Sequence, residues 1–146
     1  MLLVRTRVGP SPIHGLGLFA DQAIPAGTEI WRFAPGLDVD VAPGVVERLP
    51  DHVRAFFARY GYVDRRLARY VLCFDDARFM NHSDRPNVAV DADGRHVRAL
   101  VAIEPGDELT IDYLAQPVPE RYLRSTEVRR LRTTVGDTGT RGRTSR

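Results

Sequence analysis

The segment that decides the fold lies just past the middle of the chain, where residues 77–87 read ARFMNHSDRPN. Asn81, His82 and Ser83 supply several hydrogen-bond donors and acceptors in succession, and a Pro-Asn pair closes the segment with a turn signal. Apolar residues flank the segment on both sides, which predicts a non-helical connection between two strands. Polar groups in such a place must be satisfied, so the segment alone indicates a buried polar turn and not a function.

A second segment lies further along the chain, where residues 106–113 read GDELTIDY. The Glu-Pro-Gly-Asp run that leads into it is a turn signal, because proline has a fixed φ and glycine accepts a positive one. Residues 108–112 are therefore expected to form a strand that ends at Tyr113. A phenol at a strand end can pack its ring while its hydroxyl faces a cavity, although a single tyrosine there usually belongs to the core or its rim.

A third segment lies near the start of the chain, where residues 14–20 read HGLGLFA. Gly15 and Gly17 flank one residue, so the backbone can approach a ligand closely and use its N–H and C=O groups to bind it. A plain turn explains two such glycines as well. The pattern of dinucleotide-binding folds is absent, because no further glycine follows at the required position and no β-α-β unit surrounds the segment. Phosphate binding is therefore not expected.

The rest of the chain is predicted to be mainly β. Short apolar runs at residues 28–33, 87–90 and 96–102 favour strands. An Asp-Gly pair between the last two runs is a strong hairpin signal.

One stretch departs from this pattern and predicts a short helical insert. Apolar residues recur there at helical spacing, namely Val45, Leu49, Val53, Phe56, Phe57 and Tyr60. Asp51, directly after Pro50, is expected to cap this helix.

Length and composition indicate a single domain. The chain has 146 residues, of which 43% are hydrophobic and 27% charged, the balance of an ordinary folded protein. The first residues are interrupted too soon by Arg5 and Arg7 to form a signal peptide or a spanning helix, so we expect a cytoplasmic protein outside the membrane. Cys73 is the sole cysteine, which excludes an internal disulfide and a zinc site of several cysteines. We expect no metal, and a buried, apolar role for Cys73.

Charge is distributed unevenly along the chain. Residues 1–116 contain 13 Arg and 16 acids, whereas residues 117–146 contain 8 Arg and 3 acids. A mildly acidic body favours a cationic ligand or peptide, although an excess of this size is usually an ordinary solvated surface. The arginines of the tail are dispersed, so nucleic-acid binding there is expected to be non-specific at most. All 21 basic residues are arginine, and the chain contains no lysine.

Together and in this order, the three segments resemble the SET-domain family of protein-lysine methyltransferases. The resemblance rests on Gly-x-Gly, then Arg-Phe-x-Asn-His-Ser-x-x-Pro-Asn, then Pro-x-Gly-x-Glu-Leu-Thr-x-Asp-Tyr, and it covers residues 5–115. It implies a SET domain over residues 1–116 with the β-clip fold: small curved sheets and a variable helical insert at about residues 36–72. It also implies a pseudoknot that threads the Asn-His-Ser segment beside the Glu-Leu-Thr strand.

The same resemblance implies a cofactor, a substrate and a reaction. S-adenosylmethionine is the expected methyl donor, and the side-chain amine of a lysine in a protein or peptide partner is the expected acceptor. The methionine end of the cofactor would be held by the glycine loop, its amino-acid and adenine portions by the Asn-His pair, and that pair by an arginine. The matching cofactor-binding residues are Gly15, Leu16, Gly17, Arg78, Asn81 and His82.

The family also places two tyrosines at the catalytic centre. Tyr113 is the expected catalytic tyrosine, and the second is assigned to Tyr62, with Tyr60 and Tyr70 as alternatives. The residue two before the last tyrosine influences how many methyl groups fit in this family. Here it is Ile111, which is smaller than the aromatic residues often found there, so we expect that more than one methyl group can be added.

Two departures from the family pattern concern the lid of the site. Asp84 stands where many relatives have cysteine, and no cysteine cluster follows Tyr113, so this is a minimal SET domain without the zinc-bound lid. Residues 117–135, with a short amphipathic helix and Tyr122, are expected to cover the active site, unless a second subunit of a homodimer does so. Residues 136–146 are expected to form a disordered basic tail. The alternative function is a SET-like pseudoenzyme or protein-binding module without turnover.

Overall fold

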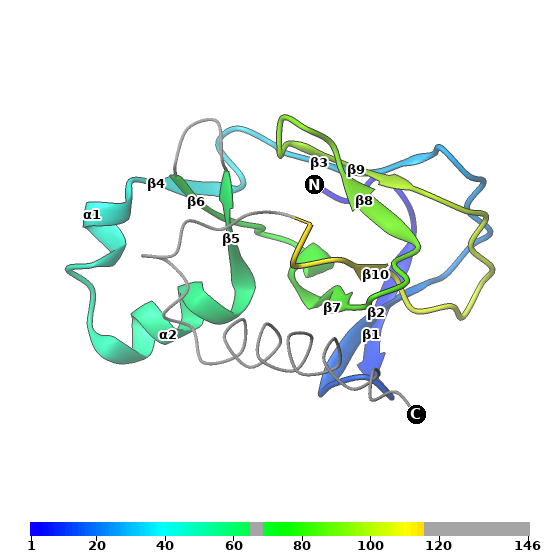
Figure 1. Cartoon of the computed structure of the whole chain (residues 1–146), viewed down its shortest axis with the longest axis horizontal. Coiled ribbons are helices and arrows are strands. Elements are labelled where there is room, and N and C mark those ends of the chain that lie inside the picture. The colour runs from blue at the N-terminus through cyan, green and yellow to red at the C-terminus, as the bar shows by residue number, and fades with distance from the viewer. Residues whose placement is uncertain (65–68, 116–146) are drawn as a thin grey trace, which may run out of the picture.

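The computed structural model describes residues 1–64 and 69–115 (Figure 1). Within these ranges the chain forms three small sheets with short helices. The strands are β1 (Thr6–Pro10), β2 (Leu16–Ala20), β3 (Glu29–Arg32), β4 (Val39–Val41), β5 (Gly61–Asp64), β6 (Arg69–Leu72), β7 (Asn81–His82), β8 (Val88–Val90), β9 (His96–Ala99) and β10 (Thr110–Ile111). The helices are α1 (Pro43–Val46), α2 (Asp51–Tyr60) and the 3-10 helix η1 (Asp76–Phe79). The predicted class, mainly β with a short helical insert, is confirmed.

β1 and β2 form an antiparallel hairpin that carries the Gly-x-Gly segment. The register pairs Gly9 with Gly17 and Pro10 with Leu16, so the second strand begins inside that segment. Leu18 and Ala20 are buried in the core. Their burial explains why the segment continues as a strand although its glycines indicate only a turn.

The largest sheet has the order β3-β9-β8-β10-β7, and its connectivity brings distant segments together. β10 lies between β7 and β8 and runs parallel to both, with Thr110 opposite Asn81 and Ile111 opposite His82. Residues 83–87, which join β7 to β8, therefore pass around β10 (Figure 1). The predicted position of the Asn-His-Ser segment beside the Glu-Leu-Thr strand is confirmed.

The region predicted as a helical insert contains a sheet as well. β4, β6 and β5 form a three-stranded antiparallel sheet, with α1 and α2 at the same end of the molecule (Figure 1). Sequence patterning missed these strands because each has only three or four residues, too few to show a clear alternation.

The helix predicted over residues 45–60 is divided into α1 and α2. The predicted cap is wrong: Pro50 occupies the N-cap position of α2, and Asp51 is the first helical residue. The carboxylate of Asp51 accepts a hydrogen bond from Arg54 at 2.6 Å instead of one from the backbone. Proline fits this position because it fixes φ and brings no N–H that would need a partner.

The main core lies between the β1-β2 hairpin and the five-stranded sheet. Leu18 of β2, Ile30 of β3, Val88 of β8 and Leu109, just before β10, are all 0% exposed. These residues come from three of the predicted strands and from the hairpin, so burial of their side chains fixes the hairpin against the sheet. Cys73 lies in the same cluster at 7% exposure, as predicted.

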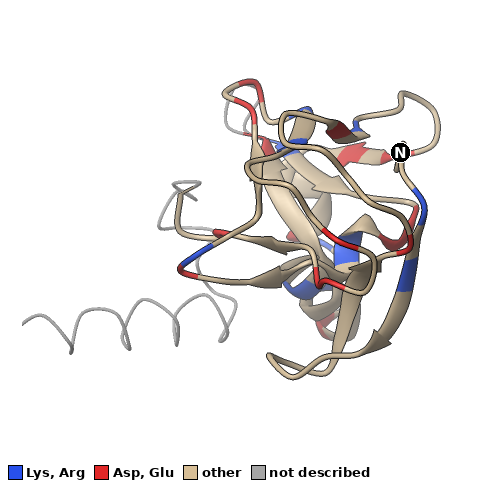
Figure 2. Ribbon diagram, turned by 90° about the vertical axis from the view of Figure 1, so that its right-hand side faces the viewer, with Lys and Arg blue, Asp and Glu red and all other residues tan. Residues whose placement is uncertain are grey.

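Acidic and basic positions are interspersed along the ribbon of the described part of the chain (Figure 2). Of the helices in residues 1–64 and 69–115, none has the length and apolar composition needed to cross a membrane. In the same residues, no three His, Cys, Asp or Glu side chains come together as metal ligands would. The segments predicted at residues 117–135 and 136–146 lie outside the described residues.

Candidate active site

Asn81, on β7, fastens the glycine loop to the five-stranded sheet. Its Nδ2 donates to the backbone oxygens of His14 and Leu16, at 3.2 and 3.0 Å, and to Oε1 of Glu108 at 2.7 Å. Asn81 is buried, so these hydrogen bonds are shielded from water. Two of the motifs predicted from sequence are therefore in direct contact, although they lie more than 60 residues apart in the chain.

Ser11 organises the same loop together with Glu108. Its hydroxyl lies 2.8 Å from each carboxylate oxygen of Glu108 and accepts a hydrogen bond from the N–H of Ile13 at 2.9 Å. The N–H of Ser11 donates to the backbone oxygen of Gly15 at 3.0 Å, which closes the turn. Neither Ser11 nor Glu108 is among the site residues predicted from sequence, although Glu108 lies within the second segment.

Each glycine of the loop has a steric reason to be glycine. Gly15 has a φ of +52°, in the left-handed region that side chains disfavour. At Gly17 a Cβ would lie 2.3 Å from Oε1 of Glu108 and 3.0 Å from Cβ of Ser11. Leu16, between the glycines, is 50% exposed, so the loop presents backbone and one apolar side chain at the surface.

A cavity of about 160 Å³ is lined by Met80, which precedes β7, and by Ile111 of β10; the glycine loop is not part of its wall. Its wall includes Tyr113 and Tyr62, the two predicted catalytic tyrosines, and also the alternative Tyr60. The other alternative, Tyr70, does not line it; the ring of Tyr70 packs edge-on against Phe57 at 6.3 Å. Trp31, Met80 and Ile111 complete much of the apolar wall, and Arg59, Arg78 and Asp112 bring charge to it.

Tyr113 connects the cavity to the Asn-His-Ser segment. Its hydroxyl donates to the backbone oxygen of Met80 at 2.6 Å, and its N–H donates to Nδ1 of His82 at 3.2 Å. The rings of His82 and Tyr113 lie 5.5 Å apart. Met80 and His82 therefore contact Tyr113, and Asn81, which lies between them, contacts the glycine loop.

A known family shares this order of glycine loop, polar strand and terminal tyrosine. The family model described as the SET domain matches residues 15–114. This chain belongs to the SET-domain family. The match contains the glycine loop, the Asn-His-Ser strand and Tyr113, so all the cofactor-binding positions predicted from sequence fall inside it.

Two solved structures have a fold similar to that of this SET domain. One is a putative histone methyltransferase of Plasmodium falciparum, 23% identical, with a TM-score of 0.55 over 77% of this chain and 95% of that one. The other is DIM-5, a histone lysine methyltransferase of Neurospora, 19% identical, with a TM-score of 0.59. That match covers 82% of this chain but 55% of the DIM-5 chain. At these identities the likeness establishes the fold.

Tyr62 lies in the wall of the cavity in this SET domain, with its hydroxyl turned to the β8-β9 turn. The hydroxyl donates to the backbone oxygen of Gly94 at 3.0 Å, and the ring packs edge-on against Trp31 at 6.3 Å. Burial raises the pKa of Tyr62 well above its ordinary value of 10.0, and the nearby carboxylate of Asp38 acts in the same direction. Tyr62 is therefore a neutral phenol near neutral pH.

Arg78 and His82, both predicted as cofactor residues, hold neighbouring loops. The guanidinium of Arg78 donates to the backbone oxygens of Phe74 and Asp75, at 3.0 and 2.9 Å, and so fixes the turn before η1. Nε2 of His82 lies 3.2 Å from the carboxylate of Asp84. Arg78 thus fixes the turn that leads toward the Asn-His-Ser segment, and it also lines the cavity.

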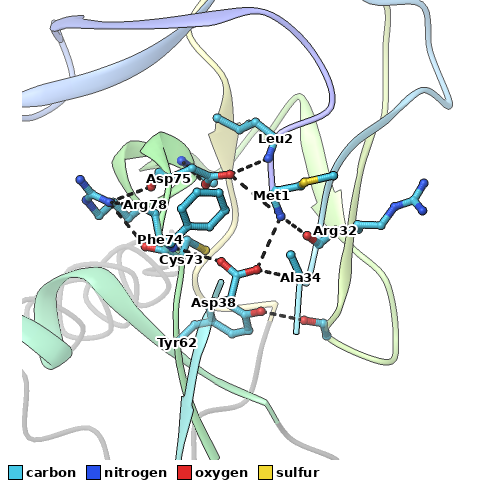
Figure 3. A network of polar contacts seen from close by, with 12 residues as sticks. Met1, Leu2, Arg32, Ala34, Asp38, Tyr62, Cys73, Phe74, Asp75 and Arg78 are labelled. Carbon is cyan, nitrogen blue, oxygen red and sulfur yellow. Dashed lines mark hydrogen bonds and ion pairs between the residues drawn. The ribbon is translucent and has the colours of Figure 1, made fainter. Parts of the chain in front are cut away.

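Behind the cavity, Asp38 ties β3 to the end of β6 (Figure 3). Its side chain is 0% exposed and accepts hydrogen bonds from the N–H of Ala34 at 2.7 Å and of Phe74 at 3.0 Å. The amino group of Met1 lies 3.5 Å from the same carboxylate. Burial of the Cys73 thiol raises its pKa from 9.0 to about 12, and the negative charge of Asp38 adds to this rise.

Proposed function

We propose that this SET domain transfers a methyl group from S-adenosylmethionine to the side-chain amine of a lysine in a protein substrate. The observation that carries the proposal is the position of residues 80–82. Asn81 holds the glycine loop, while Met80 and His82 hold Tyr113 in the wall of the cavity. A donor bound at the loop and an amine entering the cavity would meet at this strand.

The residues around the glycine loop fit such a donor. The carboxylate of Glu108 fills the space that a side chain at position 17 would take, and its negative charge beside the loop suits a ligand with positive charge. The residues that would hold the cofactor are Gly15, Leu16, Gly17, Asn81 and His82, with Arg78 behind them. When bound, S-adenosylmethionine supplies a methyl group on a positively charged sulfur.

The two cavity tyrosines are suited to orienting an amine. Each hydroxyl donates its proton to a backbone oxygen, Tyr113 to Met80 and Tyr62 to Gly94. A hydroxyl that donates its proton can also accept a hydrogen bond, and the N–H of an amine is a donor of the right kind. The raised pKa of Tyr62 keeps it protonated, so its role is to position the amine and not to act as a base.

The attacking amine must be neutral, whereas a free lysine has a pKa of about 10.4. Burial among apolar side chains such as Trp31, Met80 and Ile111 would lower the pKa of the ammonium, and a nearby positive charge would lower it further. No side-chain base is then required. The main task is alignment of the reacting atoms, which can contribute roughly 7–11 kcal/mol of barrier reduction in well-oriented reactions.

A basic protein segment is the proposed substrate. Residues 1–116 contain more acids than arginines, which favours a cationic peptide, and both structural neighbours carry names of histone methyltransferases. The target would add as a strand beside a sheet edge and place its lysine in the cavity. This chain has no lysine of its own, so the lysine must come from another protein.

The direct test is transfer of a radiolabelled methyl group. The full chain is incubated with labelled S-adenosylmethionine and a basic histone-tail peptide, in parallel with a peptide in which every lysine is replaced by arginine. Label is expected on the lysine peptide only. Tyr113→Phe should abolish transfer while the cofactor still binds in calorimetry, and Tyr70→Phe, a tyrosine outside the cavity, serves as the matched control.

Other outcomes would change the assignment. Cofactor binding without transfer to any lysine peptide or protein extract would favour a pseudoenzyme, and wild-type transfer by Tyr113→Phe would remove its assigned role. A chain that lacks residues 117–146 tests the predicted cover: transfer should fall if this segment or a homodimer through it closes the site. Nucleic-acid binding lost in the same deletion, with transfer intact, would confine that binding to the tail. The cytoplasmic location remains a prediction.

A further inference from the structure

Glu108 is a carboxylate that joins three segments of the site. Its Oε1 accepts from Nδ2 of Asn81 at 2.7 Å, and both of its oxygens lie 2.8 Å from the hydroxyl of Ser11. The backbone of Glu108 is fixed as well. Its backbone oxygen accepts a hydrogen bond from Nδ2 of Asn87 at 2.8 Å, and its main chain forms an antiparallel β-bridge with Phe19. The side chain is therefore held in one place under the glycine loop.

The charge of this carboxylate has no cationic partner in the part of the chain that the structure describes. The groups bonded to it, the amide of Asn81 and the hydroxyl of Ser11, are neutral. No ion pair within residues 1–64 and 69–115 includes Glu108, whereas Asp38, Asp40 and Asp64 each have a positively charged neighbour. The hydrogen bonds from Asn81 and Ser11 reduce the cost of burying this carboxylate but leave its negative charge unneutralised within the described residues, so it can attract a cationic ligand.

Geometry alone does not require a charge at this position. A neutral glutamine of the same shape would also accept a hydrogen bond from Asn81 or Ser11 and would fill the same space beside Gly17. The negative charge therefore has a use beyond the fastening of the loop. The surface it faces is the glycine loop, where the proposed function places a ligand that carries positive charge.

We infer that Glu108 is a positioning residue with two effects: it fixes the glycine loop through Ser11 and Asn81, and it supplies the negative charge that makes this loop selective for a cationic ligand. The inference rests on the proposed function. S-adenosylmethionine carries a sulfonium that its demethylated product, S-adenosylhomocysteine, lacks. The charge of Glu108 would therefore favour the donor over the spent product and assist exchange of one for the other.

The test compares the affinities of the two ligands, measured by calorimetry on the full chain. Glu108→Gln removes the charge and keeps the shape, so it should weaken S-adenosylmethionine binding by about tenfold and S-adenosylhomocysteine binding by less than about threefold. Ser11→Ala keeps the charge and loosens the loop, so it should weaken both ligands by the same factor. Glu104→Gln, the same change on an exposed turn, is the matched control and should alter neither.

A purely structural role would not change the ratio of the two affinities, which makes this ratio the decisive readout. Equal loss for both ligands in Glu108→Gln, or no loss for either, would overturn the inference. If Glu108→Gln does not unfold cooperatively, Glu108→Asp is the deciding variant. It keeps the negative charge, so the ratio of the two affinities should stay as in the wild-type chain. A ratio near one in Glu108→Asp would also overturn the inference. A wild-type chain that binds neither ligand would refute the proposed function itself, a different result from either of these.

Discussion

The guanidinium of Arg95 lies 3.2 Å from the carboxylate of Asp64, whose side chain is 1% exposed. Arg95 sits in the turn between β8 and β9, whereas Asp64 ends β5, so this ion pair joins the three-stranded sheet to the five-stranded one. Arg95 also reaches Asp40 at 3.4 Å and stacks over Phe33 at 4.2 Å. The turn that Arg95 holds contains Gly94, whose backbone oxygen accepts the hydroxyl proton of Tyr62.

Removing this guanidinium should destabilise the fold strongly. Arg95→Met takes a cationic neighbour from the buried carboxylate of Asp64 and also removes the contacts with Asp40 and Phe33, and we expect the free energy of unfolding in urea to fall by on the order of 3 kcal/mol. Arg98→Met is the matched control, because Arg98 pairs with Asp91 at the surface of the same hairpin and such pairs contribute about 1 kcal/mol or less. Equal losses in the two variants would contradict the assigned role of Arg95.

Gly17→Ala tests the packing of the glycine loop. The new methyl group would meet the carboxylate of Glu108 at 2.3 Å, so Glu108 must move, and we expect a loss of about 1–3 kcal/mol in unfolding free energy. Cofactor binding should weaken too, since the loop shifts. Gly44→Ala, where the nearest atom to the added carbon is 3.7 Å away, should change stability by less than about 1 kcal/mol. A neutral Gly17→Ala would show that the loop yields easily.

Two single substitutions separate the candidates for the second catalytic tyrosine. Tyr62→Phe should lower kcat by on the order of tenfold or more, because an acceptor for the amine is lost from the cavity. Tyr60→Phe should lower kcat by less than about threefold, since its ring packs between Phe56 and Phe79 and its hydroxyl is not assigned to the amine. Steady-state methylation with saturating cofactor measures both. The reverse order of effects would transfer the role to Tyr60.

Ile111 should govern how many methyl groups enter the cavity. It lines the cavity wall and leaves more room than an aromatic residue would. We expect di- or trimethylated lysine from the wild-type chain, and Ile111→Tyr should restrict the product to monomethyllysine without loss of cofactor binding. Mass spectrometry of the peptide product counts the methyl groups. Monomethyllysine alone from the wild-type chain would refute the expectation.

Cys73 should respond to pH in a defined window. Burial raises its pKa from 9.0 to about 12, so the folded state keeps a proton that the unfolded state releases. Its contribution to stability is present below pH 9.0 and is lost as the pH rises from there toward 12. The difference in unfolding free energy between the wild-type chain and Cys73→Ala should therefore shrink over that range. The native thiol should also react slowly with iodoacetamide until the chain is unfolded.

The sequence predicted the class of fold, four of the strands in part and the contact between its motifs. Those successes share a cause: turn signals such as the Glu-Pro-Gly-Asp run and alternating apolar residues act locally, and the motifs resemble a known family. Positions such as Asn81 and Tyr113 were assigned by that resemblance, and the structure places them around one strand. Their chemical roles remain for the experiments above to test.

The missed features depend on contacts between distant residues. Glu108 belongs to a recognised motif, but nothing in its neighbours along the chain shows that Ser11, nearly a hundred residues earlier, will meet its carboxylate. The short strands β4, β5 and β6 form because they pair with one another, not because their sequences alternate. Aspartate is a common N-cap residue, which is why Asp51 was predicted there; in the structure Pro50 takes the N-cap position and Asp51 is the first helical residue.

The position of β10 between β7 and β8 also bears on when the protein can acquire its active form during synthesis. Residues 81–90 are synthesised before residues 110–111, so the two outer strands must wait for a central partner that is made later. Until then the polar groups of Asn81 and His82 face water or non-native neighbours. A nascent chain that ends before residue 110 would thus contain the glycine loop and Tyr62, but it would lack the strand that brings β7 and β8 together.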